Sequence, residues 1–484
     1  MTEVYHIRVQ GHLDADWSEE FEGLTIIHQS GGTSLLCGVL ADQSVLHAVL
    51  LKVRDLGLPL LSLSRIERDK SDHSPSKTEQ KRKLDEMQQR TTDDKLNPFP
   101  RYRFMRETNP VYFDPQYHFW QVSRYDDVAR VLSEYTSFSS EMGGARFSLD
   151  FEGDQGGENS AGDQGDDPMS SSMFNMDPPR HRQLRNLVTQ AFTPRSIAQL
   201  SGRITTITNT LLDQVAATGH MDAIDDLAYP LPVIVIAEML GIPQEDREQF
   251  KLWSDAVVGA SESGNGNPQA EMSNYFLDMI QQRNRERKDD LISALLDAQI
   301  DGQHLNQREF LGFCILLLVA GNETTTNLIG NALLCFDEHP EVMEQLRAEP
   351  ELLPGAIEEV LRYRSPVQFM YRRVVADVTL RGSQLRANQM VLALIGSANH
   401  DESQFSNPDS FDIRRTPNRH IAFGQGIHFC LGAPLARLEA KFALTLLLQR
   451  FDEIQRVRGV PVEAAGADFA YGVKHLPITF RERV

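Results

Sequence analysis

The chain has 484 residues, a net charge of −20 and a mean hydropathy of −0.35. This length predicts more than one structural unit, and the acidic balance argues against a nucleic-acid-binding protein, which needs a basic surface. The N-terminus lacks the basic and apolar parts of a signal peptide, and the longest apolar run, residues 313–321, is shorter than the roughly 20 residues that a membrane span needs. We therefore expect a cytoplasmic protein with no membrane span and no nucleic-acid partner.

Residues 1–68 predict a small α+β domain. Period-two and helical patterns give the order strand, helix, strand, strand, helix, strand, which is typical of a ferredoxin-like fold. The expected strands are residues 4–11, 24–29, 33–40 and 59–67, and the expected helices are residues 15–21 and 42–57. No catalytic constellation is visible in this domain, so its role is unknown, and we interpret it as an interaction or oligomerisation module.

Residues 69–96 are polar and mixed in charge, which predicts a linker. From residue 97 to residue 484 the pattern becomes mainly helical, with short strands around 110–122, 371–394 and 476–481. The stretch 150–167 carries seven acids, five glycines and no base, so we expect a solvated acidic loop. The expected helices are residues 125–135, 180–192, 196–216, 232–240, 270–286, 307–337, 341–348, 353–364 and 433–450.

One of the four cysteines, Cys430, stands in the stretch "AFGQGIHFCLGAPLARLE", just before a helical pattern. A helix N-terminus favours an anion, and a thiolate is the form of cysteine that binds a metal, so we expect a depressed pKa for this thiol. Gly424 and Gly426 allow the preceding backbone to turn tightly and to approach a flat group. The pattern indicates that Cys430 is a ligand residue whose sulfur binds another group, and a thiolate at this place is suited to a metal.

Three further segments place unusual residues on helices. The apolar helix expected at 307–337 contains the polar sequence "AGNETTT", which indicates either a functional kink or a locally satisfied distortion. Glu359 and Arg362 are spaced for an ion pair on one helix face, and His181 and Arg185 form a cationic pair suited to a carboxylate. Each signal is weak alone, because solvated helix faces often carry such pairs.

Together the four segments resemble the cytochrome P450 heme-thiolate monooxygenases of the soluble bacterial type. The resemblance covers residues 97–484 and follows the family's order of motifs. The heme-binding motif F-x-x-G-x-x-x-C-x-G, the oxygen-activation motif A-G-x-[DE]-T-T, the E-x-x-R motif and the H-x-x-x-R motif are all present. The residues that match them are Phe423, Gly426, Cys430 and Gly432; Ala320, Gly321, Asn322, Glu323, Thr324 and Thr325; Glu359 and Arg362; and His181 and Arg185.

The resemblance implies a mainly α fold, a helical domain with small β-sheets, preceded here by the small α+β domain. It implies a heme b (iron protoporphyrin IX) with Cys430 as the axial thiolate, which is the metal ligand. His181, Arg185, Arg372 and His428 match partners of the heme propionates, although Arg373 is an alternative to Arg372. Phe423, Gly424 and Ala320 would lie against the heme, whereas Glu359 and Arg362 would be structural.

Glu323 and Thr324 match the acid–alcohol pair that delivers protons, which favours monooxygenation, substrate–H + O2 + 2 e− + 2 H+ → substrate–OH + H2O. Electrons would come from NAD(P)H through a separate ferredoxin or flavodoxin-type donor and its reductase. The expected pocket walls, around Val319 and Ala320, 367–370, 472–473 and 143–173, are mostly apolar and predict a hydrophobic substrate such as a terpenoid, steroid, fatty acid or secondary metabolite. A heme-thiolate isomerase or peroxide-driven enzyme and a heme-based sensor are the alternatives.

Overall fold

The computed structural model describes residues 3–66 (without 12, 14–20, 22–23, 30–32, 41–42 and 57), 95–141, 172–257, 268–299, 302–465 and 468–483. The chain divides into two compact units, 1–81 and 82–484, which are treated separately below. The linker expected at 69–96 lies almost wholly outside the described residues, as does the acidic stretch 150–167. The domain limits inferred from the sequence therefore stay a prediction.

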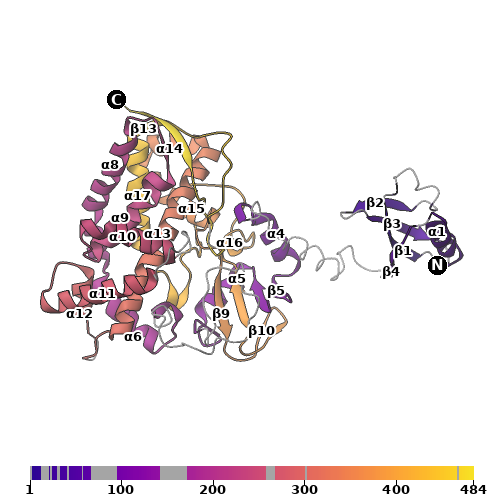
Figure 1. Ribbon diagram of the computed structural model, residues 1–484, viewed down its shortest axis with the longest axis horizontal. Helices are drawn as coiled ribbons and strands as arrows, with labels where there is room; N and C mark the ends of the chain where they lie inside the picture. Colours follow the sequence, from indigo (N-terminus) through magenta and orange to yellow (C-terminus); the bar gives the residue numbers. More distant parts are fainter. Residues whose placement is uncertain are drawn as a thin grey trace. The chain divides into compact units, whose positions relative to one another are not determined.

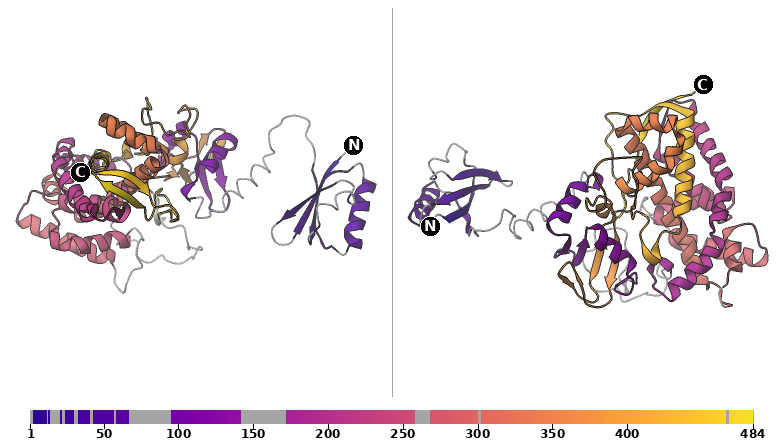
Figure 2. Two further views of the ribbon diagram at one scale, coloured as in Figure 1. Left: turned by 90° about the horizontal axis from the view of Figure 1, so that it is seen from above. Right: turned by 180° about the vertical axis from the view of Figure 1, so that it is seen from behind.

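The N-terminal unit is a four-stranded antiparallel sheet in the order β2-β3-β1-β4, with helix α1 against one side of the sheet (Figure 2). The alternation of Ile7 and Val9, which are buried, with Arg8, which is exposed, shows why the period-two pattern folds as a strand with one covered face. The predicted ferredoxin-like arrangement is confirmed, although the helix expected at 15–21 falls outside the described residues except at its last position. The elements are β1 (Glu3–Gln10), β2 (Thr25–Gln29), β3 (Thr33–Leu40), α1 (Gln43–Asp55) and β4 (Leu60–Ile66).

The large unit is mainly helical and is organised around α13, the long helix Gln307–Glu338 (Figure 1). Helices α9 (Pro230–Met239), α15 (Leu353–Tyr363) and α17 (Ala433–Arg450) pack against α13, and α8 (Ser201–Ala216) packs along α17. The other helices are α4 (Phe99–Thr108), α5 (Tyr125–Ser133), α6 (Arg180–Ala191), α7 (Pro194–Gln199), α10 (Arg247–Val257), α11 (Pro268–Arg285), α12 (Leu291–Asp297), α14 (Pro340–Ala348) and α16 (Ile395–Ala398).

Small sheets border these helices. A five-stranded sheet has the order β5-β6-β12-β9-β7, in which β12 and β6 run parallel and the other neighbours run antiparallel. A three-stranded sheet, β13-β14-β8, and the hairpin β10-β11 complete the described strands. The bounds are β5 (Val111–Asp114), β6 (Phe119–Val122), β7 (Phe138–Ser139), β8 (His220–Asp222), β9 (Met370–Val374), β10 (Val378–Leu380), β11 (Ser383–Leu385), β12 (Met390–Ala393), β13 (Phe451–Arg456) and β14 (Pro477–Glu482).

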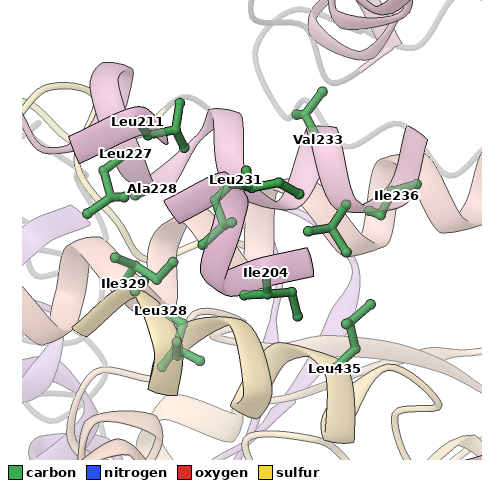
Figure 3. Close-up of a cluster of buried hydrophobic side chains, with 14 of the residues drawn as sticks. Ile204, Leu211, Leu227, Ala228, Leu231, Val233, Ile236, Leu328, Ile329 and Leu435 are labelled. Atoms are coloured by element: carbon green, nitrogen blue, oxygen red, sulfur yellow. The ribbon is translucent and has the colours of Figure 1, made fainter. Parts of the chain in front are cut away.

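The core of the large unit forms where α8, α9, α13 and α17 meet. Figure 3 shows Ile204 of α8, Ile236 of α9, Leu328 of α13 and Leu435 of α17 in this buried hydrophobic cluster. Each of these helices contributes a buried apolar stripe, which stabilises α8, α9 and α17 although they have no side-chain N-cap. The helices that this cluster holds in place also supply the walls of the site described below.

The helix predictions differ from the structure at a few places. The helix expected at 196–216 is divided at Leu200 into α7 and α8, and α4, α10, α12 and the short α16 were not predicted. Of the two alternatives for the polar middle of α13, the satisfied distortion fits better, because the helix continues without a break from 307 to 338 and Thr324 Oγ1 donates to the Ala320 carbonyl over 2.7 Å.

Candidate functional site

Cys430 lies at the end of a loop that closes on itself before α17 begins. The Cys430 N–H donates to the Phe423 carbonyl over 2.9 Å, so residues 423–430 form a closed turn. Gly424 and Gly426 have φ values of +72° and +71°, a region that favours glycine, and a Cβ on Gly426 would lie 2.7 Å from Ser133 Cα on α5. The tight turn expected from the two glycines is therefore confirmed.

The electrostatic surroundings of the Cys430 thiol combine two opposing effects. Burial raises the pKa of Cys430, and this effect outweighs the backbone N–H groups of Gly432 and Ala433, which hydrogen-bond to the sulfur and lower it, as do Arg185 and Arg437. The N–H groups at the helix start thus lower the pKa of this thiol as expected, but burial of the sulfur, which local sequence does not reveal, raises it by more. A bound metal ion would supply the positive charge that makes a buried thiolate stable.

A large cavity opens above this loop, with about 1610 Å³ of space including its mouth. The described lining comes mainly from α6, α9, α13, β9, the loop before α17 and α17 itself. It includes Met173, Phe174, His181, Arg185, Phe192, Ile236, Met239, Phe313, Leu316, Leu317, Ala320, Thr324, Thr325, Val367, Met370, Arg372, Phe423, Gly424, His428, Cys430, Leu435 and Glu439.

The basic residues that were predicted to hold propionates all line this cavity. The rings of His181 and His428 lie 4.3 Å apart, and Arg185 Nη2 donates to the Phe429 carbonyl over 2.6 Å. The pKa of His181 is lowered to about 4, mainly by burial and to a smaller extent by the positive charge of Arg185. Burial, followed by the charge of Arg372, lowers the pKa of His428 to about 3. The structure thus brings together four basic side chains from three parts of the chain: α6, β9 and the loop before α17.

The choice between Arg372 and Arg373 follows from strand alternation on β9. Arg372 is buried and lines the cavity, and burial lowers its pKa to about 10. Arg373 points to the other side, where it donates to the Glu141 carbonyl over 2.8 Å and to Asn388 Oδ1 over 3.2 Å. Successive residues of a strand face opposite sides, so only Arg372 can serve the cavity.

These residues fit an anionic, largely apolar cofactor such as heme. His428 Nε2 is buried without a hydrogen-bond partner among the described residues, which is costly unless a ligand accepts from it. Among the described carboxylates, Asp177 is the one that acts on both His181 and Arg372, so the basic cluster is short of negative charge. Two carboxylates would relieve the mutual repulsion of the cluster, and the apolar lining would cover the rest of the group.

Of the site residues predicted on α13, some line the cavity and one does not. Ala320 and Thr324 line the cavity, as does Thr325, whereas Glu323 is partly buried and is absent from the described lining. Thr324 Oγ1 is engaged with the helix backbone, as noted above. The structure therefore places the alcohol of the predicted acid–alcohol pair at the cavity, but not its acid.

The buried Glu359–Arg362 ion pair holds residues of the segment 399–418, which precedes the loop that carries Cys430, and neither side chain belongs to the described lining of the cavity. Arg362 Nη2 lies 2.8 Å from Glu359 Oε1 with both side chains 0% exposed, and Arg362 also donates to the carbonyls of Asn399, Pro408 and Ser410. Arg415 donates to the same carboxylate over 3.1 Å. This geometry agrees with the structural role that the resemblance implies.

Only some of the residues predicted to form the cavity walls belong to its described lining. Val367 and Met370 belong to the described lining, whereas Val319, Gly472 and Val473 do not, and residues 143–171 lie outside the described residues. Phe423 lines the cavity and carries Arg437 over its ring at 4.5 Å from the centroid. Sequence reasoning missed Glu439, whose only signal is its place on the otherwise apolar stripe of α17 one turn after Leu435.

One described helix, α13, is long and apolar enough to cross a membrane by length and composition. However, 67% of its most hydrophobic window is buried inside the protein, as in a core helix.

A half-buried thiol that lines the cavity on a closed loop, a basic cluster and a large apolar cavity together define a heme-thiolate site. Comparison with known proteins agrees: the cytochrome P450 family matches residues 266–462. Cytochrome P450 109 of Bacillus spizizenii is 42% identical over 402 residues, which cover 80% of this chain and 93% of that protein. The chain belongs to the cytochrome P450 family; it is a monooxygenase of the kind that uses heme iron and O2 for hydroxylation or epoxidation.

Further relatives extend this comparison. The cyclomarin C epoxidase CymV of Salinispora arenicola is 40% identical over 389 residues, covering 78% of this chain and 95% of that protein. Among solved structures, substrate-free CYP109E1 of Bacillus megaterium has a TM-score of 0.74 at 42% identity and covers 80% of this chain and 100% of that one. The same enzyme with corticosterone has a TM-score of 0.71 at 40% identity, covering 80% and 99%. Residues 4–64 match a domain of unknown function, DUF8691.

Proposed function

We propose that this cytochrome P450 hydroxylates or epoxidises a hydrophobic small molecule of the terpenoid, steroid, fatty acid or secondary-metabolite type. The observation that carries the proposal is the lining contributed by α9, α13 and neighbouring segments. Its side chains offer a substrate dispersion and hydrophobic burial with few polar groups. The residues concerned are Phe192, Ile236, Met239, Phe313, Leu316 and Leu317. A relative crystallised with corticosterone supports a substrate of this class.

The basic cluster and Cys430 have distinct roles in this proposal. His181, Arg185, Arg372 and His428 would hold the two propionates of a heme, and the Cys430 thiolate would hold its iron. The bound heme supplies the iron at which O2 is activated, and thiolate ligation favours cleavage of the O–O bond. The N–H groups of Gly432 and Ala433 stabilise negative charge on the sulfur.

Thr324 and Glu323 of α13 deliver protons to the cavity in this proposal. Thr324 lines the cavity and holds a hydroxyl where a water or an oxygen can exchange a hydrogen bond with it. Glu323, the preceding residue, supplies a carboxylate outside the described cavity lining. Glu323 and Thr324 together control coupling, which is the fraction of consumed electrons that yields product. Electrons come from NAD(P)H through a separate ferredoxin or flavodoxin-type donor and its reductase, in the cytoplasm.

The experiment begins with a screen of hydrophobic compounds by their shift of the heme Soret band, followed by turnover with a generic reductase system. Product and hydrogen peroxide per NAD(P)H are then measured for the wild type and for Thr324→Ala. We expect Thr324→Ala to release more peroxide and less product, with substrate affinity changed by less than the tenfold that about 1.4 kcal/mol represents.

The matched control is Thr206→Ala on α8, because Thr206 makes the same local bond, to the Gly202 carbonyl over 3.0 Å, on an exposed surface. Equal coupling in all three proteins would contradict the role of Thr324. A wild-type protein that binds no hydrophobic compound would contradict the proposed substrate class.

A further inference from the structure

The cavity wall includes the stretch 366–370, which follows α15 and ends at the first residue of β9. Three of its side chains belong to the described lining, namely Pro366, Val367 and Met370. Gln368 and Phe369, which lie between them in the chain, are buried but do not belong to that lining. Phe369 packs in an apolar cluster, whereas the amide of Gln368 is costly to bury unless its oxygen and its nitrogen both have partners.

The side-chain amide of Gln368 is used at both ends. The Tyr102 hydroxyl of α4 donates to Gln368 Oε1 over 3.0 Å, and Gln368 Nε2 donates to the Ser365 carbonyl over 2.7 Å. Tyr102 is 4% exposed and Ser365 is 1% exposed, so water does not compete for these bonds. Hydrogen bonds in such surroundings are strong and directional, and they fix the beginning of the wall stretch relative to α4.

The main chain at Gln368 is tied to two further segments. The Gln368 N–H donates to the Phe469 carbonyl over 2.8 Å, and the Gly396 N–H donates to the Gln368 carbonyl over 3.0 Å. A Cβ on Gly396 would lie 2.2 Å from Gln368 Oε1, so any side chain at this position would displace the amide. Ile395, the residue before this glycine, lines the cavity. Gln368 therefore connects two parts of the cavity wall.

We infer that Gln368 is a positioning residue for the cavity wall and that it thereby decides which part of a bound substrate reacts. The inference rests on the proposed monooxygenase function. Gln368 is outside the described lining and acts through Val367 and Met370, which belong to it. A substrate reacts at the atom that the walls hold nearest the reactive centre, so a wall displaced by about 1 Å is sufficient to change the product.

Three substitutions disturb this arrangement from different sides. Gln368→Met removes both side-chain hydrogen bonds at similar volume, Tyr102→Phe removes one hydroxyl, and Gly396→Ala pushes against the amide. None of the three residues belongs to the described lining. The matched control is Gln121→Met, because Gln121 is a second buried glutamine, 2% exposed, whose amide also accepts one side-chain hydrogen bond and donates another.

The first test uses ligands of the heme iron and needs no substrate. The affinities of imidazole and of 4-phenylimidazole are measured from the Soret shift of the full-length holoenzyme. Imidazole reports on the iron site, and the phenyl group of the larger ligand reports on the cavity wall. We expect the ratio of the two affinities to differ severalfold from the wild type in Gln368→Met and Gly396→Ala, by a smaller factor in Tyr102→Phe, and not in Gln121→Met.

The outcomes of this test are decisive in either direction. A wild-type ratio in every variant that retains heme would overturn the inference. An equal change in Gln121→Met would overturn it as well, because the effect would then be a general loss of packing. If Gln368→Met and Gly396→Ala retain no heme, Tyr102→Phe decides, since it removes a single hydroxyl.

The second test measures the product distribution, KM and kcat with a substrate found in the Soret screen. We expect Gln368→Met, but not Gln121→Met, to shift the product distribution severalfold. A merely structural role would reduce the amount of heme-loaded enzyme and leave the distribution unchanged, and that result would overturn the inference. Failure of the wild type to form product would contradict the proposed function instead, and the imidazole comparison would still decide the role of Gln368.

Discussion

The two units of the protein differ in what they bury. In the N-terminal unit the described core is apolar, formed by residues such as Ile7, Leu24 and Val49, and the buried Ser34 is satisfied by Leu13 N–H and the Gly11 carbonyl. The large unit buries histidine, arginine and glutamate side chains around one cavity.

Buried charged groups reduce stability unless they are paired or used, so their concentration in one unit marks where the chemistry takes place. The N-terminal unit instead exposes leucines on α1, directly after it and on β4, namely Leu51, Leu56, Leu60 and Leu61. A surface of this kind agrees with the interaction module expected from the sequence. The comparison therefore places the chemistry in the large unit, whereas association through the small unit stays a prediction, and four measurements test the division between the units.

The largest effect is expected from Cys430→Ser. If Cys430 is the iron ligand, the long-wavelength Soret band of the reduced CO complex, which is typical of thiolate ligation, should disappear completely. Cys335→Ser is the control, because burial raises the pKa of that thiol to about 12 and it does not line the cavity. Survival of the band in Cys430→Ser, with its loss in Cys335→Ser, would show that the ligand is misassigned.

The next largest effect is expected from the double variant His181→Ala, Arg185→Ala. Each charged hydrogen bond to a buried carboxylate contributes about 1.5–3 kcal/mol, so heme should dissociate at least roughly tenfold more readily per lost contact, without loss of folding. Heme transfer to apomyoglobin measures this rate. Arg373→Ala, the neighbour that faces away from the cavity, should retain heme like the wild type. Unchanged retention in the double variant would argue against propionate binding.

A smaller effect concerns the pH dependence of stability. Burial raises the pKa of Glu439 from 4.5 to about 8. Between these pH values the unfolded chain releases the proton of this group while the folded chain keeps it, so the group lowers stability as the pH rises through that window. At about 1.4 kcal/mol per pKa unit, the cost above the window is on the order of 3–5 kcal/mol.

Glu439→Gln removes this dependence. Relative to the wild type, the variant should gain stability in chemical unfolding as the pH is raised from below 4.5 to above 8. Parallel stability profiles of the two proteins would mean that Glu439 is ionised in the folded state.

The smallest effect is expected from removing the N-terminal unit. A chain that begins at Lys95 keeps the 2.9 Å ion pair of Lys95 with Asp468 and the 2.8 Å hydrogen bond from Tyr471 to the Leu96 carbonyl. We propose that this chain folds, binds heme and shows the same substrate-induced Soret shift as the full protein. Loss of heme binding would show that residues before Lys95 are an integral part of the large unit, and the comparison between units would fail.

Local sequence was sufficient for much of the site. The loop that ends at Cys430 is short and contiguous, so its glycines and its sulfur could be predicted together, and β9 alternation is enough to separate Arg372 from Arg373 once the strand is known. The helix α13 was predicted nearly to its ends because its apolar run is long and Asn306 forms a capping box with Glu309.

The remainder depended on tertiary contacts. The raised pKa of Cys430 and the neutral state of Glu439 both result from burial, which no local pattern records. Helix α4 was missed because its sequence is polar, and its Arg106 is buried against the Ser397 carbonyl, supplied by a segment far along the chain. In such cases the environment, rather than the propensity of the residues, decides the structure.

The contacts of Glu359 also have a consequence for the order of folding. Its carboxylate accepts hydrogen bonds from the Asp412 N–H, from Arg415 and from Asn418, partners that are 53, 56 and 59 positions away in the chain. Contacts of such long range form late, because the entropy of closing the intervening loop opposes them. We therefore expect the segment that leads into Cys430 to become ordered only after α15 has docked, so that the loop for the heme is completed late in folding.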